Sequence, residues 1–507
     1  MFLPFLDTKD DKTALMLRFG GLDLRDKAAA GSLSQSENLS ADAYPALTPR
    51  KSRQLVVADI GITAGVLPEY TGEPLSAFTG VKDGGFYYQG SRIGTEVLSP
   101  GEKSIADFGG KICIFPDKLY YNYLPDPDTG EVSQTLTSME NTLSLSGVRF
   151  YSSYNELTGA YTAYLSKTGG GFDRFSAGDS IVIEGCSNSQ NNTYSLQGRK
   201  DFAAADAIVS AVVTKSAANR LDLLLYTKSG SKALFTNTTE AGTITVKVSI
   251  PDMNHICVHN NRLWGTDQNG EYLYASKLGD CCNFHSFQGL GDDSWYSVIG
   301  TPGSFTGIVS YRSAVVAFKH DCIHHVYGDG PKNYSIPKQT AGGCIDGRSI
   351  AELKGVLYYL SHAGFCAYNG GEPYGVSPQL PVEYTSGTAG TDGVRYFVSA
   401  CRANGDRDLL VYDPEKALWH REDDTHFLGF LHYGNRLYGV CEDGIWAFAQ
   451  GDEQVCWGMT TQPLTYDTLL HKGVRALWLL LDKEMDTTVT VSISHDGKDF
   501  VPCAALS

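Results

Sequence analysis

The sequence predicts an all-β protein whose larger part is a β-propeller of six or seven blades. The 55 glycines and the 11% aromatic content favour short strands joined by tight turns. A unit of about forty residues, containing three or four short apolar strands, recurs along the chain. No long segment shows helical periodicity. A single sheet of this kind would expose two apolar faces, and a radial arrangement of several sheets buries both.

The chain is expected to begin with an arm, residues 1–53, that has little structure of its own. Ser, Ala and Gly are scattered through it, and the prolines at positions 45 and 49 keep the preceding residues extended. Whether this arm supplies a closing strand to the last blade stays open at this point.

The first blades are assigned to residues 54–146 and the remaining blades to residues 250–460. The earlier part carries a loose copy of the repeat at residues 78–90 and a clearer one at residues 105–121. In the later part the equivalent positions follow one another at intervals of 52, 42, 39 and 41 residues; they are Leu263, Val315, Leu357, Tyr396 and Leu437.

Two further units interrupt or follow the repeat. Ile112 and Leu263 are 151 residues apart, which is one blade plus an insertion of about 100 residues. Alternating strands predict a small β-barrel or sandwich over residues 147–249, in which residues 203–213 fit either a short helix or a strand. Residues 461–507 are expected to form a C-terminal β-hairpin or sandwich unit, with strands at 474–481 and 487–494 and a turn at Asp496-Gly497.

Composition and charge restrict the partners. A net charge of −16 opposes a surface built to grip nucleic acid, so at most non-specific, passing contact with DNA is expected. The N-terminal residues do not resemble a secretory signal, and no apolar run is long enough for a membrane span. We therefore expect synthesis in a cytoplasm and no membrane partner.

The twelve cysteines are interpreted as reduced structural thiols. Six of them lie in apolar strand-like runs, where free cysteine behaves as a small hydrophobic residue, and no Cys-x-x-Cys pair occurs. The vicinal pair Cys281-Cys282 is unusual; buried free thiols are favoured over a redox switch.

Several clusters suggest chemistry, but each has a simpler explanation. His320, Cys322 and His324 would share one face of a strand and could bind zinc, although the flanking apolar residues favour an ordinary hairpin. Residues 126–131 resemble a calcium loop without its downstream ligand, and residues 494–500 resemble the Asp-box of sialidase-type propellers; both are interpreted as turns.

A glycosidase would need two carboxylates beside the scissile bond. Asp292 and Asp293, or Glu422, Asp423 and Asp424, could supply them, but acidic loops facing solvent explain these residues equally well. The sequence therefore predicts no catalytic residue, no cofactor and no metal site. The basic residues Arg50, Lys51 and Arg53 are the candidate partner contacts, for an acidic subunit or for DNA; a solvated linker is the alternative.

Several short phrases resemble virion proteins of tailed phages that belong to the propeller type, namely tail hub, nozzle and head–tail stabilisation proteins. These phrases lie between residue 38 and the end of the chain; they include Asn38-Leu39-Ser40, residues 44–51, residues 114–118, residues 261–265 and Tyr274-Ala275-Ser276. The resemblance implies a ring-forming homo-oligomer, often of six copies, that binds portal, adaptor or tail proteins and carries no catalysis.

Three functions are compatible with these observations. The first is a structural subunit of a phage tail or neck that connects neighbouring virion proteins, lines a DNA passage and turns its negative charge towards that lumen. The second is a tail protein that binds or cleaves host glycans, with paired carboxylates at the propeller axis and a sugar stacked on Trp264, Trp295, Trp419 or Trp446. The third is an interaction scaffold unrelated to phage. The resemblance favours the first.

Overall fold

A computed structural model describes residues 15–28, 31–65, 77–194, 206–337, 340–464, 476–482 and 487–506 of the chain. Within these ranges the structure is almost entirely β, with three 3-10 helices of one turn each: η1 (Phe172–Arg174), η2 (Ser189–Asn191) and η3 (Gly347–Ser349). None of the helices in the described ranges is long and apolar enough to cross a membrane.

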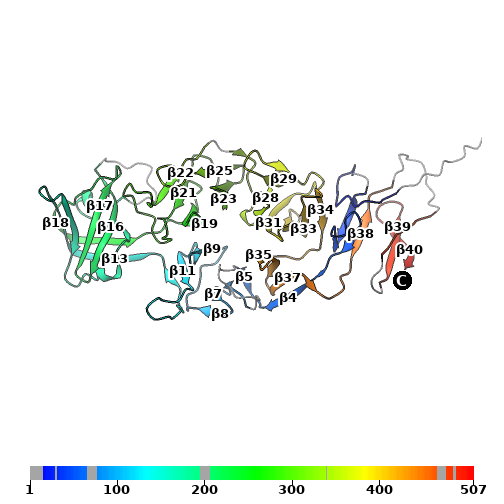
Figure 1. The fold of residues 1–507 in the computed structure, drawn as a ribbon, viewed down its shortest axis with the longest axis horizontal. Coiled ribbons are helices and arrows are strands. Elements are labelled where there is room, and N and C mark those ends of the chain that lie inside the picture. The colour runs from blue at the N-terminus through cyan, green and yellow to red at the C-terminus, as the bar shows by residue number, and fades with distance from the viewer. Residues whose placement is uncertain are drawn as a thin grey trace, which may run out of the picture.

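Seven four-stranded antiparallel sheets form the blades of the propeller (Figure 1). Blade one contains β5 (Ile62–Gly65), β6 (Gly80–Lys82), β7 (Gly85–Tyr88) and β8 (Ser91–Ile93); blade two contains β9 (Ser104–Phe108), β10 (Lys111–Phe115), β11 (Leu119–Asn122) and β12 (Thr137–Ser138). Blade three contains β19 (Met253–His259), β20 (Arg262–Asp267), β21 (Tyr272–Ala275) and β22 (Trp295–Val298); blade four contains β23 (Phe305–Tyr311), β24 (Ala314–Lys319), β25 (Cys322–Tyr327) and β26 (Thr340–Ala341). Blade five contains β27 (Ala351–Leu353), β28 (Val356–Ser361), β29 (Gly364–Tyr368) and β30 (Tyr374–Gly375); blade six contains β31 (Tyr384–Thr391), β32 (Tyr396–Arg402), β33 (Arg407–Asp413) and β34 (Leu418–Arg421). Blade seven contains β35 (Gly429–Tyr433), β36 (Arg436–Cys441), β37 (Gly444–Gly451) and β4 (Ser52–Ala58).

The core of the propeller consists of separate apolar layers between neighbouring blades. Every position used to define the repeat falls in the second strand of its blade and is buried. Because successive side chains of a strand point to opposite faces, the second strand of a blade contributes apolar side chains to the layers on both sides of that blade. Leu263, for example, packs against blade two, whereas the next residue, Trp264, packs against blade four. Seven such layers close a circle, which confirms the predicted propeller and fixes the number of blades at seven.

The ring is closed by a strand from the N-terminal part of the chain. β4 pairs antiparallel with β37 as the outer strand of blade seven, with Val57 opposite Ile445 and Ala58 opposite Gly444. The predicted boundary at residue 53 was therefore wrong: residues 52–58 complete the last blade rather than opening the first.

The expectation of an arm with little structure was also wrong for the described residues before β4. β1 (Leu33–Glu37) pairs with β38 (Gly458–Thr461), and β2 (Leu39–Ser40) pairs with β3 (Thr48–Pro49). Phe19, Leu33 and Leu39 form an apolar cluster with Leu418 of blade six, so apolar side chains hold this segment against the propeller.

The inserted unit is a closed six-stranded barrel, which decides between the predicted barrel and sandwich. Its strands follow the order β13-β14-β17-β16-β15-β18 around the barrel. They are β13 (Asn141–Asn155), β14 (Ala160–Ser166), β15 (Ser180–Glu184), β16 (Ile208–Ala217), β17 (Arg220–Thr227) and β18 (Thr238–Val248). The helical alternative for residues 203–213 was wrong where the structure describes it, because residues 208–213 belong to β16; residues 203–205 lie outside the described residues.

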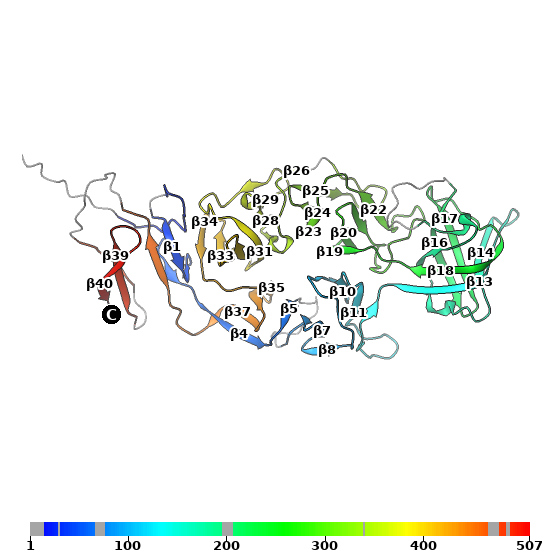
Figure 2. The same ribbon diagram turned by 180° about the vertical axis from the view of Figure 1, so that it is seen from behind.

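The barrel and the C-terminal unit lie at opposite ends of the propeller, as both views show (Figures 1 and 2). The C-terminal unit contains a hairpin of β39 (Val489–Ser494) and β40 (Phe500–Leu506), with Gly497 in the turn at φ 77°. The strand expected over residues 474–481 is not present in its described part: residues 476–482 form no strand, and residues 474–475 lie outside the described residues.

Candidate interaction sites

The basic residues that were predicted to contact a partner lie at the junction between β4 and blade six. Arg53 Nη2 is 2.7 Å from Glu422 Oε2, and its Nη1 is 2.9 Å from Asp423 Oδ2. Arg50 Nη2 is 3.1 Å from the same Asp423 oxygen, and Arg50 Nε donates to Asn38 Oδ1. The side chains of Arg50 and Arg53 are 12% and 9% exposed. The structure places both arginines in internal ion pairs, and of the three predicted residues Lys51 alone is exposed.

The electrostatics of this junction follow from its burial. Burial would raise the pKa of Asp423, but the charge of Arg53 and the hydrogen bonds from Arg53 and Thr425 hold it below its ordinary value. Burial and the neighbouring charge of Arg53 lower the pKa of Arg50. Arg53 also lies over the rings of Phe427 and Phe448, at 5.3 and 5.0 Å from their centroids. The junction therefore fixes the N-terminal segment to the last two blades.

Three of the five carboxylates considered for glycan cleavage, Asp293, Glu422 and Asp423, have structural partners. Asp293 is buried and accepts hydrogen bonds from Ser286 Oγ and from the backbone N–H groups of Gln288 and Leu290. Glu422 and Asp423 hold the arginines of the closing segment. The Asp293 carboxylate therefore stabilises its own loop, and the carboxylates of Glu422 and Asp423 stabilise the closure of the ring.

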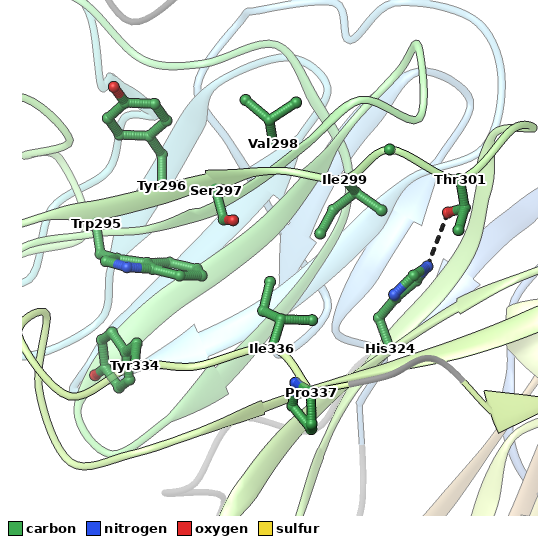
Figure 3. A pocket seen from close by; sticks show the side chains of 11 residues that line it. Trp295, Tyr296, Ser297, Val298, Ile299, Thr301, His324, Tyr334, Ile336 and Pro337 are labelled. Atoms are coloured by element: carbon green, nitrogen blue, oxygen red, sulfur yellow. Dashed lines mark hydrogen bonds between the residues drawn. The ribbon is translucent and has the colours of Figure 1, made fainter.

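A cavity of about 500 Å³ lies between the outer edges of blades three and four (Figure 3). Trp295 and Val298 of β22 line one side, and Tyr334, Ile336 and Pro337 line the other. His324 donates to or accepts from Thr301 Oγ1 at 2.8 Å, and burial lowers its pKa to about 4. Among the described residues, which leave out positions 338 and 339 next to Pro337, no carboxylate, lysine or arginine lines this cavity.

The tryptophans proposed to stack a sugar lie in different environments. Trp264 and Trp419 are buried in the layers between blades, and Trp446 is half-buried in β37, where its Nε1 donates to Asp443 at 3.2 Å. Trp295 alone among these four lines the cavity, and it does so at the outer edge of the ring and not at the axis. The described residues therefore do not assemble the expected pair of carboxylates beside an aromatic platform.

The histidine-rich segment of blade four forms the predicted hairpin. β24 and β25 pair directly, and His320 lies in the exposed turn between them, 2.8 Å from Asp321. Cys322 and His324 do share a face, with 3.6 Å between Sγ and Nε2. The part of the chain that the structure describes contains no cluster of three or more His, Cys, Asp or Glu residues suited to a metal ion.

Both acidic segments considered as special loops are turns. Asp126 Oδ1 accepts from the backbone N–H groups of Asp128 and Thr129. Asp496 Oδ1 accepts from those of Lys498 and Asp499, and these bonds lower the pKa of Asp496 to about 2. Each carboxylate organises its own turn.

Both ends of the molecule expose large apolar side chains. At the barrel end, the β13–β14 hairpin carries Tyr154 and Tyr161, whose ring centroids are 4.6 Å apart, and ends in Leu157, which is 98% exposed. At the C-terminal end, Trp478 and Leu480 are 90% and 101% exposed. The apolar composition of residues 476–481 suggested a strand in the sequence, but nothing in it indicated that the segment would remain on the surface.

The structure also brings together three cysteines that the sequence did not connect. Cys113 of β10 joins Cys281 and Cys282, which follow β21, in the layer between blades two and three. Only the vicinal pair was visible as an unusual feature in the sequence, because the third thiol comes from a distant repeat.

Comparison with known proteins gives likenesses of fold alone. No family model and no curated protein matches the chain. Among solved structures, BamB from Moraxella catarrhalis aligns over 80% of this chain and 99% of its own, with 13% identity and a TM-score of 0.34. Hsv2 from Kluyveromyces lactis aligns over 46% of this chain and 67% of its own, with 13% identity and a TM-score of 0.27. The computationally designed Ika8 protein aligns over 69% of this chain and 98% of its own, with 10% identity and a TM-score of 0.28.

Proposed function

We propose that this chain is a structural protein of a tailed-phage virion, a ring-forming component of the tail hub, nozzle or head–tail junction. In this role it connects neighbouring virion proteins and lines a passage for DNA. Its partners are further copies of itself and portal, adaptor or tail proteins, and its location is the tail or neck of the particle.

The observation that carries this proposal is the apolar surface of the C-terminal unit. Leu477, Trp478 and Leu480 are each at least half exposed, and Phe500 and Val501 of the adjoining hairpin are 49% and 62% exposed. A two-stranded hairpin is marginally stable in water by itself, and clustered exposed apolar side chains mark surfaces that other proteins cover. We infer that another subunit packs on this unit.

The arrangement of the appended units supports the same function. The barrel and the C-terminal unit extend from opposite ends of the propeller (Figure 2), so the chain offers separate contacts in two directions, as a connector requires. The net charge of −16 suits a conduit that does not bind its DNA cargo, and we expect this charge to concentrate on the luminal face.

Mass photometry of the purified chain, combined with negative-stain imaging, tests the proposal. We expect rings of several copies for the full chain and a loss of rings when residues 462–507 are removed, because this truncation keeps β38 but deletes the exposed apolar unit. Leu157→Lys is the control: it removes an exposed apolar side chain at the tip of the barrel, at the end of the molecule opposite to the C-terminal unit. We expect this variant to self-associate like the unchanged chain.

Immunogold labelling of particles from the phage that encodes the chain tests the location, with gold expected at the tail or neck. A full chain that stays monomeric at micromolar concentration and is absent from particles would overturn the proposal. Release of sugar from host envelopes by such a monomer would favour the glycan-cleaving alternative.

A further inference from the structure

The three-cysteine cluster lies at the layer between blades two and three. Cys113 and Cys281 are fully buried, and Cys282 is half-buried. Cys281 Sγ lies 3.9 Å from Cys282 Sγ, and the thiols of Cys113 and Cys281 are also hydrogen-bonded to each other. Cys281 is therefore the central member, with one sulfur neighbour from its own loop and one from the preceding blade.

The surroundings favour a reactive sulfur at Cys281. Hydrogen bonds from Cys113 and Cys282 and the charge of Lys111 lower the pKa of Cys281, although burial opposes this effect. Lys111 is held nearby on β10, where its Nζ lies 4.8 Å from the centroid of the Tyr120 ring. Cys281 is therefore the thiol of this cluster whose surroundings most favour the nucleophilic thiolate form.

Geometry decides which neighbour Cys281 can join. A disulfide needs Cα atoms roughly 4.4–6.8 Å apart, whereas consecutive residues across a trans peptide have Cα atoms only about 3.8 Å apart. A bond between Cys281 and Cys282 would therefore strain the loop. Cys113 approaches from a separate strand and has no such constraint.

We propose that Cys113 and Cys281 form an oxidation-dependent disulfide that cross-links blade two to blade three, with a peroxide as the oxidant. Cys282 is the least buried member of the cluster, and we expect the peroxide to reach Cys281 beside it. This site goes beyond the proposed virion function and does not depend on it.

The reaction is balanced by the groups present. The Cys281 thiolate attacks one peroxide oxygen, so that an S–O bond forms, the O–O bond breaks and hydroxide leaves to take up a proton as water. The Cys113 sulfur then attacks the sulfenic acid, the S–S bond forms, the S–O bond breaks and the released oxygen leaves as a second water. Two thiols and one hydrogen peroxide give one disulfide and two waters.

The position of this cross-link matters for the fold. The barrel, which runs from Asn141 to Val248, is inserted between these two blades. Blades two and three are therefore neighbours in the ring but distant in sequence, and the disulfide would link them directly. The closed loop would contain the whole barrel, and long loops gain most from closure in the chain-entropy description. We therefore expect the oxidised chain to unfold at a higher temperature than the reduced chain.

Peptide mapping by mass spectrometry under non-reducing conditions tests the proposal. The full chain, treated with hydrogen peroxide near neutral pH and then alkylated in denaturant, is expected to yield a peptide pair linked through Cys113 and Cys281 and to lose two of its twelve titratable thiols. Cys113→Ala and Cys281→Ala are expected to lose the linked pair. Cys282→Ala is expected to keep it.

Cys441→Ala is the matched control, because Cys441 is a buried thiol of blade seven outside the cluster, and it should leave the linked pair unchanged. If the wild-type chain yields only a Cys281–Cys282 bond, or keeps all its thiols, the proposal is overturned. Because the wild-type result is decisive by itself, poor folding of a variant does not affect the conclusion, and the oligomeric state of the chain plays no part in the readout.

Discussion

At the scale of single residues, the most instructive group is the ion-pair network at the ring closure. Arg53 contacts Glu422 and Asp423 with most of its side chain buried. Buried ion pairs add little net stability over apolar replacements, but removal of one partner leaves an uncompensated charge in the protein. The network is therefore best understood as a device that specifies where the N-terminal segment docks.

Arg53→Met should lower the free energy of unfolding by about 3 kcal/mol, because among the described residues Glu422 and Asp423 then keep an ion pair with Arg50 alone. Guanidinium denaturation followed by fluorescence measures the change. The second substitution Glu422→Gln, added to Arg53→Met, should recover part of the loss. Lys51→Met is the control, since Lys51 is exposed, and an equal loss there would contradict the assignment.

Buried histidines make stability depend on pH. Burial lowers the pKa of His285 to about 4 and that of His420 to about 3, from an ordinary value of 6.5. Between the unfolded and the folded values the unfolded chain binds more protons than the folded chain, so stability is full above pH about 6.5 and falls as the pH is lowered towards 4, by up to about 1.4 kcal/mol per pH unit for each ring.

Denaturation midpoints measured from pH 7 to pH 4 test this effect. His420→Phe should flatten the decline, because the unfolded chain then takes up one proton fewer. His432→Gln replaces an exposed ring and should leave the slope as it is. A decline that is unchanged in His420→Phe would show that other groups govern the acid sensitivity.

At the scale of elements, the docking of β4 on β37 depends on the lack of a side chain at Gly444. This residue adopts φ 152°, and a Cβ at this position would collide with the carbonyl oxygen of Val57. Gly444→Ala should therefore loosen β4 and make residues 52–58 more sensitive to limited proteolysis by at least several-fold.

Gly429→Ala is the matched control for that experiment. Gly429 lies in β35 of the same blade, has no positive φ, and a Cβ there would meet no atom within 4 Å. Equal protease sensitivity in both variants would contradict the role assigned to Gly444.

The elements also show how far sequence reasoning reaches. The second strands of blades two to seven were predictable, since residues such as Leu263 and Leu357 sit in compact apolar runs at a regular interval. The pairing of β4 was not, because the local pattern of residues 52–58 is the same whether the strand opens blade one or closes blade seven. The segment 476–481 has the composition of a strand, yet strand formation also needs a pairing edge, and composition does not reveal one.

The candidate sites were less predictable than the strands, because their contacts join residues that are distant in the sequence. The basic character of Arg50 and Arg53 was evident, but their acidic partners come from blade six, and only the fold reveals that these charges are satisfied internally. Likewise, the vicinal cysteines were visible in the sequence, whereas the approach of Cys113 depends on the packing of neighbouring blades.

At the scale of the whole molecule, the barrel should be separable from the propeller. Asn141 at the start of β13 pairs with Val248 at the end of β18, so the two points where the chain leaves and re-enters the ring lie side by side. Replacement of residues 142–247 with a short Gly-Ser linker should leave a propeller that unfolds cooperatively and retains the β-sheet circular dichroism of the ring.

Removal of blade four, residues 305–341, is the contrasting deletion. It takes away one of the seven packed units, exposes the apolar faces of blades three and five and should abolish cooperative unfolding. If excision of the barrel is equally destructive, the inserted unit is an integral part of the propeller core.

The closure of blade seven also has a consequence for how the chain is made. The β4 strand leaves the ribosome long before β37 has been synthesised. Six blades and the barrel are made before Val57 can pair with Ile445. During that interval the unpaired β4 strand can pair with strands of other nascent chains, because an unpaired strand edge is a template for misassembly. Protein yield during overexpression should therefore respond to chaperone supply and to the speed of translation more strongly than the thermal stability of the finished ring would suggest.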